Sequence, residues 1–438
     1  MGNYYVWLAL VSLRRNPVLT ALMVVVIALG VAMSMTAFTV LVVMSRDPIP
    51  HKSQQLFAVQ VDNGGPRSRK PGDNEPPAQL TYRDATALLD SHQATRQVAM
   101  HQVSLTVTPA DPAMKPFPIA ARATSADFFS MFEVPMLFGH GWRAADETAG
   151  AARVVLSRKL NERLFGGTDS IGKSVNLDGA WYQVVGVTDR WDPMPRYYDV
   201  IGGQNFEEGE DAFLPLSLSI NRRMSTSEYE FCDAGPRGES FEDLLRSECV
   251  WFQFWVELPT QADEAAYRAF LTNYARDQQR AGRFGWAPNV RLRNVGDWLI
   301  AQKVVPDDAR LSSLVAFGFF VVCLVCALGI MLAKSLERAG EFGLRRALGA
   351  SGQDIFAQSM TESGVIGLLG GVLGLGFTLF ALWLIRDLFP EGMGRIASMD
   401  APLFVATVVA AVVATLLCGV YPAWRAMRAA PALQLKVG

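Results

Sequence analysis

The stretch VLTALMVVVIALGVAMSMTAFTVLVVM, residues 18–44, decides the fold. It contains no charged residue and exceeds the roughly 20 apolar residues that a helix needs to cross a bilayer. A secretory signal would have a shorter apolar core, followed by a small-residue cleavage site, and neither feature is present. We therefore interpret this stretch as a retained transmembrane helix.

Three more apolar blocks lie in the last third of the chain, at residues 311–332, 365–385 and 401–420. Hydrophobic residues make up 50% of the 438-residue chain, and the apolar blocks contain most of the excess of hydrophobic residues. The section after the first block mixes strand-like and helix-like stretches, as in a globular domain. The sequence predicts a membrane α-helical protein with four transmembrane helices and a large α+β, two-lobed extracytoplasmic domain between helices 1 and 2.

The predicted division of the chain has nine parts. They are an interfacial amphipathic helix, the first span, the extracytoplasmic domain, the second span, a cytoplasmic coupling loop, the third span, a short outer loop, the fourth span and a cytoplasmic tail. In that order they cover residues 1–17, 18–45, 46–310, 311–333, 334–362, 363–386, 387–400, 401–421 and 422–438.

Positive charge beside the spans predicts the orientation, because short cytoplasmic flanks are enriched in Lys and Arg. Arg14 and Arg15 precede the first span. Other basic residues lie between the second and third spans and after the fourth: Lys334, Arg338, Arg345, Arg346, Arg425, Arg428 and Lys436. We expect both termini in the cytoplasm. The domain outside is mildly acidic and has no dense basic tract, so we expect no nucleic-acid partner.

Within the predicted domain, residues 56–61, 181–187 and 251–258 indicate strands, and residues 157–165 and 262–279 indicate helices. The stretch GTDSIGKS at 167–174 fits the phosphate-binding loop pattern. A phosphate-binding loop follows a strand and opens a helix, whereas here a helix precedes and a strand follows. We interpret it as a turn.

The five cysteines divide into two groups. Cys232 and Cys249 lie in the predicted domain, where a disulfide between them is allowed outside the cytoplasm. Cys323, Cys326 and Cys418 lie in apolar blocks and are interpreted as small hydrophobic residues. The histidines lack metal-ligand spacing and no catalytic motif is present, so we expect no catalytic residue, metal or cofactor on this chain.

The third apolar block carries glycines at four-residue spacing, Gly367 with Gly371 and Gly370 with Gly374. Small residues at this spacing let another helix approach closely. The partner helix belongs either to this chain or to a second subunit, and the sequence leaves both alternatives open.

The most informative loop is KSLERAGEFGLRRALGASGQDIFAQSMTE, residues 334–362. It mixes charged and apolar residues and then turns at Gly349. Ser351 and Asp354 predict a new helix start. Composition alone allows either a docking element for a soluble partner or a solvated connector.

Several stretches carry a family resemblance. EFGLRRALGA at 341–350 resembles the E-I-G-x-R-R-A-x-G-A pattern of MacB/FtsX-type ABC transporter permeases. YPAWRAMR at 421–428 resembles their C-terminal ending, and LRRNP at 13–17 their N-terminal pattern. SADFF at 125–129 and IGKS at 171–174 resemble the MacB-like periplasmic core domain. The resemblance covers nearly the whole chain, and residues 202–248 match least.

The resemblance implies a multi-pass permease of the bacterial inner membrane that is not itself an enzyme. It implies ATP and Mg²⁺ on a separate cytoplasmic ABC ATPase, in two copies, and a second permease subunit in a homo- or heterodimer. A periplasmic adaptor stays open as a partner, and membrane lipid surrounds the spans. The alternative is an FtsX-like signalling or scaffold protein that regulates an extracytoplasmic partner.

We expect the ATPase to dock between Glu337 and Gln353. Polar contacts would come from Glu341, Arg345 and Arg346, whereas the side chains of Phe342 and Leu344 would fill a groove. The full hypothetical coupling set is Glu337, Glu341, Phe342, Leu344, Arg345, Arg346 and Gly349.

Overall fold

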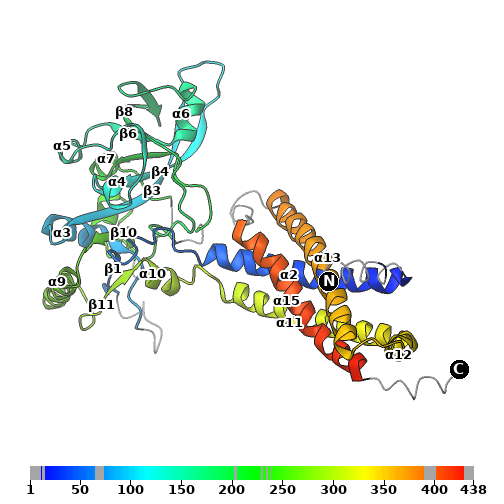
Figure 1. Ribbon diagram of the computed structural model, residues 1–438. Helices are drawn as coiled ribbons and strands as arrows, with labels where there is room; N and C mark the ends of the chain where they lie inside the picture. The colour runs from blue at the N-terminus through cyan, green and yellow to red at the C-terminus, as the bar shows by residue number, and fades with distance from the viewer. Residues whose placement is uncertain are drawn as a thin grey trace. The chain divides into compact units, whose positions relative to one another are not determined.

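The computed structural model describes residues 11, 15–64, 74–201, 205–227, 230–232, 235–236, 238–388 and 401–428. The chain divides into two compact units (Figure 1). The first, here called the helical unit, comprises Met1–Ser45 and Val305–Gly438, and the second, the inserted domain, comprises Arg46–Val304. Most of the predicted amphipathic segment Tyr4–Arg15 and the outer loop at 389–400 lie outside the described residues.

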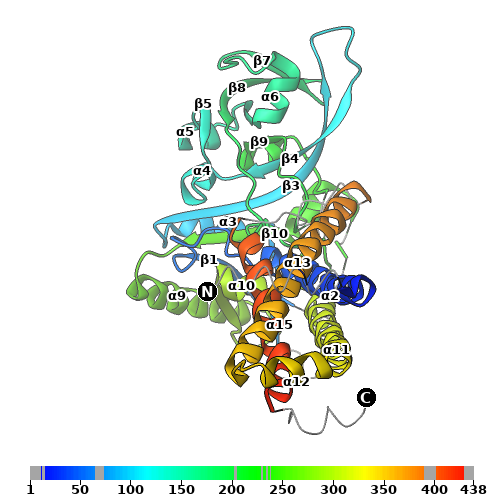
Figure 2. The same cartoon turned by 45° about the vertical axis from the view of Figure 1, so that its right-hand side comes forward.

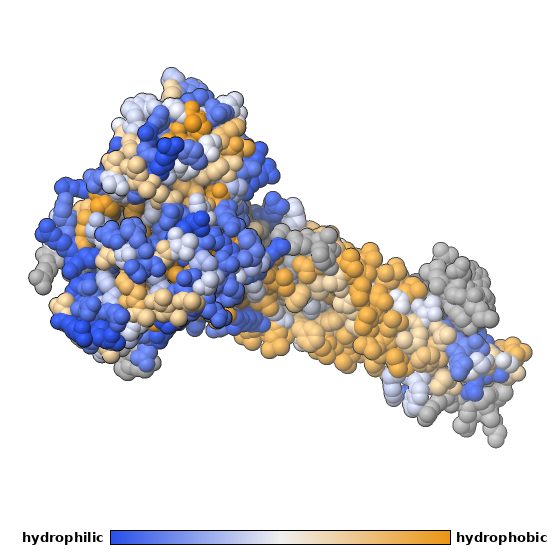
Figure 3. All heavy atoms as spheres, turned by 60° about the vertical axis from the view of Figure 1, so that its left-hand side comes forward, coloured by the Kyte–Doolittle hydropathy of each residue, from blue (hydrophilic) through white to orange (hydrophobic). Residues whose placement is uncertain are grey.

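The helical unit contains four helices that are long and apolar enough to cross a membrane, as the sequence predicts. A fifth, short helix, α12, joins two of them. The described helices of this unit are α2 (Pro17–Met44), α11 (Asp307–Glu337), α12 (Ala339–Ala347), α13 (Gly352–Leu388) and α15 (Ala401–Arg428). Their surface forms an apolar band that ends in polar residues (Figure 3).

Helix α13 packs against both α2 and α15, and α2 also packs against α11. Met23, Ile27, Met331 and Ile366 belong to the buried core of this bundle. The Ser34 hydroxyl on α2 donates to the backbone oxygen of Ala316 on α11 at 2.9 Å. In lipid, such hydrogen bonds and close packing hold helices together, because water exclusion no longer does so.

The inserted domain is built on one mixed sheet with helices on it. Its strands are β1 (Leu56–Val61), β2 (Leu80–Thr81), β3 (Arg96–Thr108), β4 (Phe117–Thr124), β5 (Met136–Gly139), β6 (Arg153–Leu156), β7 (Ser174–Leu177), β8 (Ala180–Thr188), β9 (Ala212–Pro215), β10 (Val250–Glu257) and β11 (Val290–Asn294). Its helices are α3 (Tyr82–Ser91), α4 (Phe128–Met131), α5 (Ala144–Thr148), α6 (Arg158–Phe165), α7 (Leu216–Asn221), α8 (Phe241–Arg246), α9 (Gln261–Arg280) and α10 (Val295–Ala301).

The sheet runs in the order β11-β1-β10-β3-β4-β9-β6-β8-β5, with β2 on β10 and β7 on β3 and β8. The pairs β4–β9 and β6–β8 are parallel and the others antiparallel. The long strand β3 pairs with β10 near its start and with β7 near its end, so it belongs to both lobes. One lobe gathers β1, β10, β11, α9 and α10, and the other β5, β7, β8 and α6 (Figures 1 and 2).

Local sequence signals explain several boundaries. Helix α6 begins after Ser157, whose side chain accepts from the Leu160 N–H, and ends at Gly166 in the left-handed region. The following stretch, residues 167–174, connects α6 to β7, and Gly172 has φ +81°. The phosphate-loop pattern therefore forms a turn between helix and strand, as predicted from its context.

Candidate functional site

The predicted coupling loop forms an elbow, here the segment from Lys334 to Glu362. It comprises the end of α11, all of α12 and the start of α13. Gly349, between α12 and α13, has φ +101°, a conformation that residues with a Cβ rarely adopt. Ser351 and Asp354 then form a capping pair, because the Ser351 hydroxyl accepts from the Asp354 N–H at 3.2 Å and Asp354 accepts from the Ser351 N–H at 3.0 Å.

A chain of ion pairs crosses the elbow. The Glu362 carboxylate on α13 forms ion pairs with both Lys334 and Arg338. Arg338 Nη1 lies 3.1 Å from Glu362 Oε2. The Lys334 side chain is only 7% exposed, so its ammonium group depends on Glu362 for compensation. These contacts fasten the end of α11 to the start of α13.

The series of ion pairs continues at Glu341 on α12. Its carboxylate lies 3.5 Å from Arg338, 2.6 Å from Arg345 and 3.2 Å from Arg15. Arg345 also donates to the Gln358 side chain on α13 at 3.0 Å. Glu341 and Arg345 thus hold α12 against its neighbours, so their charges serve contacts within the chain.

The inner face of α12 is apolar and buried. Phe342 is 4% exposed and packs with Ile355 and Ala426. Arg346 donates to the backbone oxygen of Met427 at 3.2 Å. Ile355 of α13 and Ala426 of α15 thus cover the Phe342 ring, and the prediction that Phe342 fills a partner's groove stays a hypothesis.

The elbow carries an apolar ridge, defined here as Leu344 and Leu348, whose side chains are 57% and 80% exposed. Leu336, at the end of α11, is also 56% exposed. Because positions four apart lie on one face of a helix, Leu344 and Leu348 project together from the end of α12. Glu337, also in the predicted coupling set, is exposed and accepts from the Asn16 side chain at 3.4 Å. The sequence had singled out Leu344 but not Leu336 or Leu348.

The four glycines of the third span serve two faces of α13. A Cβ on Gly367 or Gly371 would meet α15, at Thr415 and Ala411. A Cβ on Gly370 or Gly374 would instead meet residues of α2. Both predicted pairs therefore lie in close helix packing inside this chain. The alternative of a contact with a second subunit stays a hypothesis.

The inserted domain holds a fully buried ionic network in which Arg122 on β4 binds both Asp199 and Glu210. Tyr198 donates to Glu210 at 2.7 Å, and Gln253 donates to Asp199 at 2.9 Å. Burial alone would raise the pKa of Glu210, but the nearby arginines outweigh it and lower that pKa. The network fixes the segment between β8 and β9 onto the sheet.

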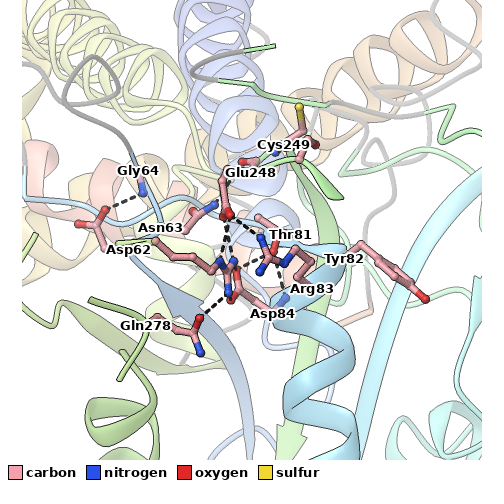
Figure 4. A network of polar contacts seen from close by, with 12 residues as sticks. Asp62, Asn63, Gly64, Thr81, Tyr82, Arg83, Asp84, Glu248, Cys249 and Gln278 are labelled. Atoms are coloured by element: carbon pink, nitrogen blue, oxygen red, sulfur yellow. Dashed lines mark hydrogen bonds and ion pairs between the residues drawn. The ribbon is translucent and has the colours of Figure 1, made fainter. Parts of the chain in front are cut away.

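A second network surrounds Arg283, just after α9. Its guanidinium binds Asp84 on α3 at 3.0 Å and Glu248, before β10, at 2.9 Å. Arg83 also reaches Glu248, at 3.2 Å, and Figure 4 shows the dashed contacts converging between Glu248 and Asp84. Desolvation opposes the charge of Arg283, but its bonds to the two carboxylates raise its pKa. The network therefore locks three elements together.

Cys232 and Cys249 are joined by a disulfide, so the structure brings the predicted pair together. Glu230 lies close to both sulfur atoms, and among the described residues these three make the only metal-compatible cluster. The disulfide removes the thiolates that a metal would need. Sequence reasoning missed both ionic networks, because their members are far apart in the chain and carry no local motif.

Two family profiles match the chain. Residues 20–274 match the MacB-like periplasmic core domain, and residues 313–431 match the FtsX-like permease C-terminal region. Together they cover both units.

The individual relatives that match this chain have low sequence identity to it. The macrolide export ATP-binding/permease protein MacB 2 of Aeromonas hydrophila is 24% identical over 267 residues, which are 61% of this chain and 36% of that protein. MacB of Pasteurella multocida is 24% identical over 312 residues, covering 70% and 41%. The chain thus spans less than half the length of these curated relatives.

Among solved structures, the periplasmic region of MacB from Actinobacillus actinomycetemcomitans matches with a TM-score of 0.37 and 14% identity, over 59% of this chain and 96% of that one. The extracellular domain of the noncanonic ABC-type transporter YknZ matches with a TM-score of 0.35 and 15% identity, over 55% and 100%.

Proposed function

The chain belongs to the MacB-like permease family, whose periplasmic core domain it contains, and from that premise we propose that it is the permease subunit of a bacterial ABC transporter. A cytoplasmic ATPase on a partner subunit binds the elbow and drives conformational change of the inserted domain. The substrate is exported or extracted on the outer side. Both termini and the elbow then lie in the cytoplasm.

The observation that carries this proposal is the apolar ridge of the elbow. Single exposed leucines are common on protein surfaces, but Leu344 and Leu348 lie together on a short helix beyond the apolar span. An amphipathic helix with an exposed apolar side can bind a partner protein by placing that side in a hydrophobic groove. Glu341 and Arg345 lie on the same face of α12 as these leucines by their spacing, and their ion pairs hold the helix in place beside the ridge.

Fixation of the elbow supports a mechanical role. Glu341 on α12 pairs with Arg15, two residues before α2, and Arg345 on α12 bonds Gln358 on α13; together with the burial of Phe342, these contacts connect α12 to its neighbours. Force applied to α12 therefore reaches the spans and is not absorbed by a loose loop. Helix α11 begins at Asp307, three residues after the last residue of the inserted domain, so the chain itself links the two units.

The direct test is Leu344→Glu combined with Leu348→Glu in the affinity-tagged chain, expressed in its native host. We expect loss of the co-purifying ABC ATPase, identified by mass spectrometry, and loss of ATP hydrolysis in the purified complex. Both side chains are more than half exposed, so the fold should tolerate the change.

Gln279→Glu is the control, because it adds a carboxylate at an exposed position on α9 of the inserted domain, outside the elbow. This variant should retain the ATPase. Charge reversal of Arg345 or Arg346 is a poorer test, because their contacts within the chain would also be lost. Equal recovery of the ATPase with the leucine variant and with wild type would refute docking at the ridge.

A further inference from the structure

A buried lysine lies where the chain enters the inserted domain. Lys52 follows the end of α2 by eight residues and belongs to the entry segment, defined here as residues 46–55. The second half of this segment folds into turns, and the Gln55 carbonyl accepts from the Leu258 N–H at 2.8 Å, directly after β10. The entry segment is therefore bound to the sheet before β1 begins.

The Lys52 ammonium group contacts three groups from two parts of the domain. Its Nζ donates to the backbone oxygen of Met131, the last residue of α4, at 2.9 Å. It also lies 3.2 Å from Glu257 Oε2, at the end of β10, and 3.7 Å from Glu133 Oε1, just after α4. Strand β10 belongs to one lobe, and the chain after α4 leads into β5 of the other. One side chain thus connects the entry segment to both lobes.

The turn at Glu133 is also held by the entry segment. Glu133 has φ +53°, in the left-handed region that residues with a Cβ rarely adopt. Its carboxylate lies 2.6 Å from His51 Nε2, beside the longer contact to Lys52. Two consecutive residues of the entry segment therefore bind the residue whose backbone conformation is the costly one.

We propose that Lys52 is the positioning residue through which movement of α2 reaches both lobes of the inserted domain. This inference rests on the proposed function, in which an ATPase drives conformational change of that domain. The side chains of Lys52 and Glu257 are 8% and 7% exposed. Separating a pair with so little access to water leaves uncompensated charge, so the entry segment moves together with its partners.

The test variant is Lys52→Met, and Arg96→Met is its matched control. Arg96 on β3 lies 2.7 Å from the same oxygen of Glu257 but does not belong to the entry segment. Each variant removes one of the two cations at Glu257, and Glu133 keeps His51 in both. Both proteins should therefore fold, and Lys52→Met alone releases the entry segment.

The measurement is hydrogen–deuterium exchange of the full-length chain co-purified with its ATPase, in lipid nanodiscs. Exchange is compared without nucleotide and with ATP plus vanadate, in peptides that cover β10 and the stretch from α4 to β5. We expect the nucleotide to change exchange in wild type and in Arg96→Met, and Lys52→Met to lose this change. Without nucleotide, all three proteins should exchange alike, which a merely structural role of Lys52 would not allow.

Loss of the nucleotide-dependent change in Lys52→Met alone supports the inference. If the change persists in that variant, or disappears equally in Arg96→Met, Lys52 has no special role and the inference is overturned, while the proposed function stands. Altered exchange of Lys52→Met without nucleotide also overturns it, because the lysine then supports the fold. If wild type with bound ATPase shows no nucleotide-dependent change, the proposed drive fails and this inference fails with it.

Discussion

Acid should destabilise the inserted domain through one buried histidine. His101 on β3 is fully buried, lies edge-on to the Trp251 ring at 4.9 Å between ring centroids, and is 3.0 Å from the Ser219 hydroxyl. Burial, and then the positive charge of Arg122, lower its pKa from 6.5 to about 3. The folded domain therefore keeps this imidazole neutral at any physiological pH.

The direction of this pH effect on stability follows from the unfolded chain, in which the histidine takes up a proton as the pH falls below about 6.5. Protonation then favours unfolding, so the stability contribution is complete above that pH and is lost progressively toward pH 3. At pH 5 the shift corresponds to about 2 kcal/mol, from 1.5 pH units at roughly 1.4 kcal/mol each.

The measurement is urea unfolding of the purified chain in detergent at about pH 7.5 and pH 5, for wild type and His101→Gln. Glutamine can still bond the Ser219 hydroxyl but does not titrate. Other groups titrate in both proteins, so the difference between their pH dependences isolates His101. Wild type should lose about 2 kcal/mol more than the variant on acidification. Parallel pH profiles would refute the assignment of a neutral, buried imidazole.

Three further variants test the other contacts by unfolding measurements on the purified chain. Arg283→Met leaves the buried Asp84 carboxylate uncompensated and should cost about 3–5 kcal/mol, whereas Arg280→Met removes only an exposed pair and should leave stability unchanged. Gly374→Leu should destabilise the helical unit by about 1–3 kcal/mol or more, because even its Cβ would meet Ala28 and Val31, whereas Gly376→Leu projects into open space and should be tolerated. Cys249→Ser opens the loop to Cys232 and should cost about 3 kcal/mol, with no further loss on adding reductant.

Local signals in the sequence were sufficient for many elements. Strand β1 covers the predicted residues 56–61, and α9 extends the predicted 262–279 by one residue at each end. Strand β1 is buried along its whole length and all its residues except Gln60 are apolar, whereas α9 opens with a Thr260–Asp263 capping box. The order of the strands was not predictable, because pairing β4 with β9 depends on residues about ninety positions apart, and no local pattern records that.

Helix α12 of the elbow shows the same limit of prediction from local sequence. Residues Phe342, Leu344 and Leu348 are all apolar, so the pattern of α12 alone does not say which face turns inward. The choice is made by Ala426, which belongs to α15 and packs on Phe342. Sequence reasoning could locate this segment and its charges, but only the tertiary contacts show that Glu341 and Arg345 pair within the chain and that the leucines stay exposed.

Charge balance separates the elbow from the two ionic networks of the inserted domain. Arg122 and Arg196 face Asp199 and Glu210, and Arg83 and Arg283 face Asp84 and Glu248, so each network is formally neutral. The elbow pairs Lys334, Arg338, Arg345 and Arg15 with Glu362 and Glu341. Enclosed charge is costly unless it is compensated, so the two buried networks need their exact balance of charges. The Arg15 and Arg345 side chains at the elbow are 67% and 33% exposed, so water compensates their charge and the elbow tolerates an unequal number of cations and carboxylates.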